Sequence, residues 1–185
     1  TVRLGANEID PKIEQFITDL RGHAILKGKK LLVFTESKET GEYLYRRLER
    51  EFPGEAMFFC STGGFYDGVE FGPAPARDLV KDHFDPNRKQ GRKDGIRILV
   101  TTDVLAEGIN LHRSNIVINY DLPWNPTRVL QRVGRVNRVG AAHDKVHVFN
   151  FFPTAQSDLH LGLEASVKAK IQAFHDTLGE DSKYL

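Results

Sequence analysis

Short apolar runs alternate with amphipathic segments along this chain. The apolar runs, which predict buried strands, span residues 31–35, 56–60, 96–101, 117–120 and 146–152. Apolar residues at helical spacing predict helices over residues 11–24, 37–52, 77–84 and 126–138, and from about residue 159 or 164 to 178. Short buried strands that alternate with helices favour an α/β sandwich with a mostly parallel central sheet.

The ends of the predicted strands are candidate functional positions, because ligands of such sheets bind beyond the carboxyl ends of the strands. The segments that follow Thr35, Cys60, Thr101 and Tyr120 occupy these positions. Glycine and proline recur from Gly63 onwards and predict no regular structure until about residue 77. A loop of this length is uncommon in compact domains and indicates function.

Composition limits the domain number and the kind of partner. The chain has 185 residues, of which 40% are hydrophobic, so we expect a single domain over residues 1–185. The formal net charge of +1 leaves any nucleic-acid surface to the local arrangement of charges. Cys60 is the only cysteine, which excludes an intrachain disulfide, and we expect no metal site. The chain has neither a signal-peptide pattern nor a membrane-span pattern, so we expect a cytoplasmic protein without a membrane partner.

An arginine-rich segment is the most informative part of the sequence. On the predicted helix, one face carries Arg128, Gln131, Arg132, Arg135 and Arg138, while valine and leucine occupy the other face. No acidic residue occurs between Asp121 and Asp144, so repulsion among the arginines predicts an anionic partner. The alternative is that acidic residues distant in sequence neutralise this face in an ordinary surface network.

Hydroxyl groups follow the predicted strands. Thr101 and Thr102 end one strand before a helical turn, an arrangement that suits a phosphate of nucleic acid. Thr102 and Asp103 are equally compatible with a helix cap. Thr35 and Ser37 end another strand, where Ser37 fits either a backbone contact or an N-cap. Ser61, Thr62, Gly63 and Gly64 end a third strand and suit close approach of a phosphate chain, or a simple turn.

Three of these segments resemble motifs of superfamily 2 helicases. Residues 131–138, QRVGRVNR, are similar to motif VI, residues 98–111 to motif V, and residues 32–37 to motif IV. The phrase NYDLPWNP at residues 119–126 resembles the Swi/Snf-type branch and related bacterial helicases. The resemblance covers about residues 10–152 and leaves about residues 153–185 as a C-terminal helical extension.

The resemblance implies a RecA-like three-layer sandwich and a role for each motif. Arg135 and Arg138 would be catalytic residues that reach the ATP phosphates, and Gln131, Gly108 and Asn110 would border the nucleotide. The nucleic-acid contacts would be Thr35, Ser37, Thr62, Gly63, Thr101 and Thr102.

The phosphate loop GxxxxGK[ST] and a Walker B Asp-Glu pair are absent from the sequence. The resemblance therefore implies the second of two RecA-like domains in a helicase or translocase. ATP and Mg²⁺ would be held mainly by a first RecA-like domain outside this chain, and we expect this domain alone to be inactive. Nucleic acid is the other expected partner, with DNA the expected polymer, although the sequence leaves RNA open. Two alternatives remain: a binding module without motor function, and a Rossmann-type enzyme, which the lack of GxGxxG disfavours.

Overall fold

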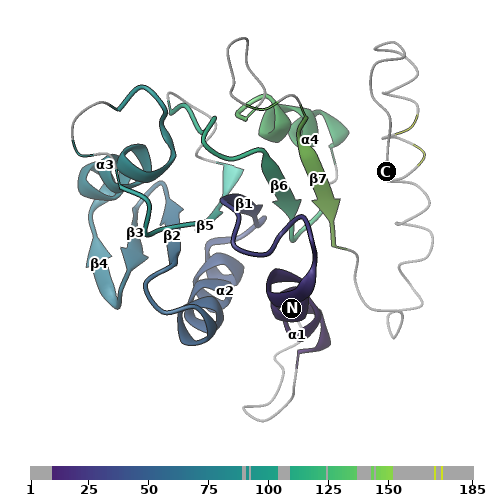
Figure 1. Ribbon diagram of the computed structural model, residues 1–185, viewed down its shortest axis with the longest axis horizontal. Helices are drawn as coiled ribbons and strands as arrows, with labels where there is room; N and C mark the ends of the chain where they lie inside the picture. Colours follow the sequence, from purple (N-terminus) through teal and green to yellow (C-terminus); the bar gives the residue numbers. More distant parts are fainter. Residues whose placement is uncertain are drawn as a thin grey trace.

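The computed structural model describes residues 10–88, 91, 93–103, 109–123, 125–136, 143, 145–151, 169 and 172. A seven-stranded sheet forms its centre (Figure 1). The elements in chain order are α1 (Pro11–Gly22), β1 (Leu31–Phe34), α2 (Lys38–Glu51), β2 (Ala56–Cys60), β3 (Gly63–Tyr66), β4 (Val69–Phe71), α3 (Pro73–Phe84), β5 (Ile98–Thr101), β6 (Ile116–Asn119), α4 (Pro126–Val133) and β7 (His147–Asn150).

The sheet has the order β4-β3-β2-β5-β1-β6-β7. The strands from β2 to β7 in this order pair in parallel, and β3 and β4 are added in antiparallel fashion at one edge. This is the mostly parallel sheet that the alternation of strands and helices predicts. Parallel pairing brings the carboxyl ends of β1, β2, β5, β6 and β7 to one edge.

Two hydrophobic clusters lie on opposite faces of the sheet. Leu31 and Val33 of β1 belong to the cluster beneath α1 and α2, whereas Leu32 and Phe34 belong to the cluster beneath α3. Figure 1 shows the sheet between α1 and α2 on one side and α3 and α4 on the other. Because successive side chains of a strand point to opposite faces, a strand covered on both faces is apolar throughout. The three-layer sandwich is therefore confirmed.

The helix starts agree with their sequence patterns. The Asp10 carboxylate accepts a hydrogen bond from the Lys12 N–H at 3.0 Å, and Pro11 occupies the first helical position of α1. Ser37 caps α2 in the same way through the Thr40 N–H at 3.1 Å. One detail of the prediction is wrong: α1 ends at Gly22, so Ala24 lies beyond the helix and is exposed.

The prediction of an irregular segment from Gly63 to residue 77 is wrong. Residues in this segment form the β3–β4 hairpin and the first turn of α3. Asp67 and Gly68 form its two-residue turn with φ of 51° and 72°, the left-handed conformations that such turns require. Pro73 begins α3 instead of preventing it, because proline needs no N–H partner at the first helical position.

The arginine-rich helix is shorter than predicted. α4 ends at Val133, and residues 134–136 form turns. Arg138, Gly108 and the predicted C-terminal helix, apart from residues 169 and 172, lie outside the described residues. None of the described helices is long and apolar enough to cross a membrane.

Candidate functional site

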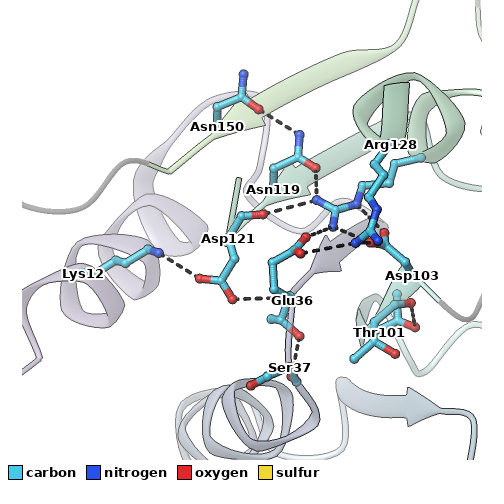
Figure 2. Close-up of polar contacts among 12 residues, drawn as sticks. Lys12, Glu36, Ser37, Thr101, Asp103, Asn119, Asp121, Arg128 and Asn150 are labelled. Carbon is cyan, nitrogen blue, oxygen red and sulfur yellow. Dashed lines mark hydrogen bonds and ion pairs between the residues drawn. The ribbon is translucent and has the colours of Figure 1, made fainter. Parts of the chain in front are cut away.

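Polar side chains from four strand ends and from α4 meet at the carboxyl edge of the sheet (Figure 2). Glu36 follows β1, Asp103 follows β5, and Asn119 ends β6. Their common position follows from parallel pairing, since Phe34 aligns with Thr101 on one side and with Asn119 on the other. Residues far apart in sequence therefore form one cluster.

Arg132 occupies the centre of this cluster. Its Nε donates to Asp103 Oδ1 at 2.6 Å, and its Nη2 donates to Glu36 Oε1 at 2.7 Å and to Asp103 Oδ2 at 3.0 Å. Its Nη1 donates to Asn119 Oδ1 at 2.8 Å and to the Asp121 carbonyl at 3.2 Å. We call Arg132 and these four partners the Arg132 network.

The Arg132 side chain is nearly closed to solvent, whereas its acidic partners are about a third exposed. Only 2% of the Arg132 side chain is exposed, and its guanidinium carbon lies 5.0 Å from the centre of the Phe34 ring. A charge that has lost its water needs compensation by ion pairs and hydrogen bonds. Glu36 and Asp103 supply the ion pairs, and Asn119 and Asp121 supply neutral oxygen acceptors.

Arg128 contacts the same two carboxylates from the outside. Its Nη1 lies 3.4 Å from Glu36 Oε2 and 3.3 Å from Asp103 Oδ2, and 51% of its side chain is exposed. These contacts are longer than those of Arg132. An exposed ion pair of this kind contributes little to stability.

The network extends through its partners to β7 and α1 (Figure 2). The Asn119 amide group donates to Asn150 Oδ1 at 2.8 Å. Asp121 accepts from the Glu36 N–H at 3.2 Å and from Lys12 Nζ at 3.3 Å. The ends of β1, β5, β6 and β7 are thereby joined through side chains.

The arginine face was expected to meet either an external anion or acidic residues distant in sequence. The contacts of Arg128 and Arg132 decide between these two interpretations for both residues. The acidic partners of Arg128 and Arg132 are Glu36 and Asp103. The alternative that distant acidic residues neutralise the face is therefore confirmed for Arg128 and Arg132.

The remaining predicted residues of the arginine segment differ in environment. Gln131 is exposed and Arg135 is partly buried. The Arg135 side chain makes no hydrogen bond or ion pair with another described residue; only its N–H is bonded, to the Arg132 carbonyl at 3.2 Å. Asn110 lies partly buried beyond the end of β5. Among the described arginines of this segment, Arg135 is therefore the one without an acidic partner.

Two of the predicted hydroxyl contacts are buried. Thr35 and Thr101 both have 0% exposure. Thr35 Oγ1 donates to the Ser37 carbonyl at 3.1 Å, and Thr101 Oγ1 donates to the Thr102 carbonyl at 3.0 Å. Thr102 is partly exposed. The structure thus uses the first two hydroxyls to shape the strand ends.

The other predicted contacts lie nearer to solvent. Thr62 is exposed, and its Oγ1 accepts a hydrogen bond from Lys38 Nζ at 3.1 Å. Ser37 is partly exposed and serves as the N-cap of α2. Gly63 has φ of 131°, and a Cβ atom there would lie 2.1 Å from the Phe71 carbonyl oxygen. Glycine at this position is therefore required by the hairpin itself.

The sequence prediction missed the acidic residues of the site. Glu36 and Asp103 each lie two residues after the end of a buried strand. This shared position is the sequence feature that indicates them. Parallel strands place such residues at one edge, where an arginine helix meets them. Within the described part of the chain, no group of three or more His, Cys, Asp or Glu side chains could hold a metal ion.

Comparison with known proteins identifies similar sequences. A family model described as the helicase conserved C-terminal domain matches residues 12–140. The uncharacterized ATP-dependent helicase YqhH of Bacillus subtilis (strain 168) is 34% identical over 151 residues, which cover 82% of this chain and 23% of YqhH. The RNA polymerase-associated protein RapA of Cronobacter sakazakii is 31% identical over 84% of this chain and 15% of RapA. The chain therefore spans less than a quarter of the length of either relative.

Solved structures share the fold. The C-terminal part of the Fun30 ATPase domain has a TM-score of 0.62 at 19% identity and covers 86% of this chain and 44% of that structure. Dbp5 L327V of S. cerevisiae bound to RNA and ADP BeF3 has a TM-score of 0.60 at 22% identity and covers 86% of this chain and 36% of Dbp5. These similarities show the RecA-like fold of helicase C-terminal domains.

Proposed function

Because this chain belongs to the helicase conserved C-terminal domain family, of the superfamily 2 type, we propose that it is the second motor domain of an ATP-dependent nucleic-acid helicase or translocase. The observation that carries this proposal is the family match over residues 12–140. The arrangement of the site supports it, since α4 and the ends of β1 and β5 meet at one edge of the sheet. That edge is where α/β sheets bind their ligands.

The nucleotide would be approached from α4 and the turn after it. Arg135 and Arg138 act on the phosphate that is transferred, and Gln131, Gly108 and Asn110 border the nucleotide. Arg135 is suited to this role because its side chain is not engaged by an acidic group of the described residues. Arginine provides a planar fork of N–H groups for phosphate oxygens.

ATP and Mg²⁺ would be held mainly by a first RecA-like domain, because the phosphate loop does not occur in this sequence. When bound, the nucleotide would supply the phosphoryl group and Mg²⁺ would neutralise its charge. The contribution of this chain is to place arginine side chains against that charge. Closure of the two domains around ATP would then move their nucleic-acid contacts relative to one another.

The nucleic-acid contacts would follow the strand ends. Thr62 offers an exposed hydroxyl, and Ser37 and Thr102 offer partly exposed ones. Buried Thr35 and Thr101 hold the backbone of two strand ends in place, and Gly63 allows the close pairing of β3 with β4 beside Thr62 at the third. DNA is the proposed polymer because the sequence segment at residues 119–126 resembles the Swi/Snf-type branch of superfamily 2 helicases.

We expect Arg135→Lys in the full-length protein to lower nucleic-acid-stimulated ATP turnover by about 10³- to 10⁵-fold, because lysine keeps the charge but loses the fork. Nucleic-acid affinity and the melting temperature should stay close to those of the unaltered protein. The measurements are phosphate release, binding to labelled DNA and RNA duplexes and single strands, and thermal unfolding.

Arg46→Lys is the matched control, since Arg46 is an exposed arginine on α2 that pairs with Glu42, away from the site. It should leave all three measurements unchanged. Unaltered turnover of Arg135→Lys, or loss of folding together with turnover, would remove Arg135 from the catalytic residues. Absence of nucleic-acid-stimulated turnover in the unaltered full-length protein would contradict the proposed function as a whole.

A further inference from the structure

All N–H groups of Arg132 are used inside the chain. A guanidinium group has five N–H donors, and five hydrogen bonds join Arg132 to Glu36, Asp103, Asn119 and Asp121. With 2% of its side chain exposed, Arg132 has no donor left for a phosphate. Although it lies between Gln131 and Arg135, its role must differ from direct contact with ATP.

The partners of Arg132 connect two regions with different proposed roles. Glu36 lies between Thr35 and Ser37, and Asp103 follows Thr102, so both belong to segments proposed to contact nucleic acid. Arg132 itself lies in the last turn of α4, next to Gln131, which is proposed to border the nucleotide. The Arg132 network therefore connects these segments directly, through shorter contacts than those of Arg128.

The chemistry of the network makes this connection stiff. Charge-assisted hydrogen bonds of 2.6 to 3.0 Å join Arg132 to both carboxylates. Moving α4 away from either strand end would leave a buried charge without its partner, which is costly. An apolar side chain often gives equal or greater stability at such a position, so stability alone does not account for this network.

We propose that Arg132 is a positioning residue that couples the nucleic-acid-contacting ends of β1 and β5 to the nucleotide-facing residues on and after α4. This inference rests on the proposed function, because it needs both ligands. If nucleic acid shifts the position of Glu36 or Asp103, Arg132 would transmit that shift to Gln131 and Arg135. The reverse transmission is required by thermodynamic linkage.

The test is the dissociation constant of the full-length protein for a single-stranded DNA, measured with and without ADP and beryllium fluoride. The ratio of the two constants reports coupling, which in proteins is typically about 5- to 150-fold. We expect Arg132→Lys to bring this ratio close to 1, because an ammonium group has three donors and cannot satisfy five acceptors. The dissociation constant without nucleotide should change by less than about 3-fold, since phosphate contacts outside the network remain.

Arg128→Lys is the matched control. Arg128 contacts the same carboxylates, but through one nitrogen at 3.3 and 3.4 Å from an exposed side chain. For Arg128→Lys, the ratio of the two dissociation constants should stay within about 2-fold of that of the unaltered protein. A purely structural role of Arg132 would reduce the folded fraction and weaken binding in both conditions, so it would not change the ratio.

Asp103→Asn provides a second route if Arg132→Lys does not fold, because it keeps the shape and an oxygen acceptor of the side chain while removing the charge. It should also lower the ratio. A folded Arg132→Lys protein, or otherwise a folded Asp103→Asn protein, that retains the original ratio would overturn the inference alone. A ratio of 1 together with no DNA-stimulated turnover in the unaltered protein would overturn the proposed function, and this inference with it.

Discussion

Three arginines of one short segment have different environments. Arg132 is buried and joined to two carboxylates, Arg128 contacts the same carboxylates from solvent, and Arg135 has no acidic partner among the described residues. Desolvation determines how strongly each charge depends on its neighbours. The three side chains therefore suit three roles: positioning, surface pairing and contact with an external phosphate.

His83 predicts a pH dependence of stability. It is buried on α3, and its Nδ1 accepts a hydrogen bond from the Ile96 N–H at 3.1 Å. Burial, together with the positive charges of Lys30 and Lys93, lowers the pKa of His83 from 6.5 to about 4. The neutral form therefore stabilises the fold above pH 6.5, and this stabilisation is lost as the pH falls towards 4.

We expect His83→Gln, which keeps a hydrogen-bond acceptor but cannot titrate, to flatten this dependence. Between about pH 7 and about pH 4.5, the free energy of unfolding of the unaltered protein should contain a loss of about 2 to 3 kcal/mol that the variant lacks. Urea denaturation at the two pH values measures both. The same loss in the variant would show that other groups cause the acid sensitivity.

The β3–β4 hairpin shows how close backbone approach determines residue choice within an element. A Cβ atom on Gly64 would lie 2.2 Å from the Phe58 carbonyl oxygen of β2, a separation that atoms do not reach. Backbone atoms of a central strand cannot move aside as the end of a flexible side chain can. The glycine that looks like a strand breaker in the sequence is thus a condition for pairing β3 with β2.

We expect Gly64→Ala to destabilise the protein by about 1 to 3 kcal/mol, because the strands must separate to admit the methyl group. Chemical denaturation of the variant gives this value. Gly22→Ala is the control, since a Cβ atom at the end of α1 would have no atom within 4 Å. That change should be neutral or stabilising by about 0.5 kcal/mol. Equal stability of the two variants would contradict the packing explanation.

At the scale of the whole molecule, parallel strand order gathers the site without any sequence proximity. β1 lies between β5 and β6 in the sheet, although β2, β3, β4 and α3 intervene in the chain. Glu36 and Arg132 are 96 residues apart and yet hydrogen-bonded. The site therefore exists only when β1 is paired with both β5 and β6.

We expect purified residues 1–185 to show no nucleic-acid-stimulated ATP hydrolysis, because the sequence lacks the loop that holds the β- and γ-phosphates. The measurement is phosphate release with saturating DNA, with the full-length protein as the positive control. Turnover by residues 1–185 that Arg135→Ala abolishes would contradict the two-domain interpretation.

Local patterns in the sequence were sufficient for much of the fold. Apolar runs identified β1, β2, β5, β6 and β7, and the caps at Asp10 and Ser37 identified the starts of α1 and α2. Such features depend on residues close in sequence, so periodicity and capping chemistry reveal them. The sequence prediction lacks the hairpin because glycine and proline usually interrupt strands, although Asp67-Gly68 between two short segments is a typical hairpin turn.

The sequence by itself determined the class of fold, the strand ends as candidate functional positions, and the resemblance to helicase motifs. Only the tertiary structure decided which arginines are already neutralised, because the carboxylates of Glu36 and Asp103 reach Arg132 across 96 and 29 residues of chain. It also decided that the Thr35 and Thr101 hydroxyls are buried. Charge pairing and burial depend on contacts between distant segments, and no local pattern of residues contains them.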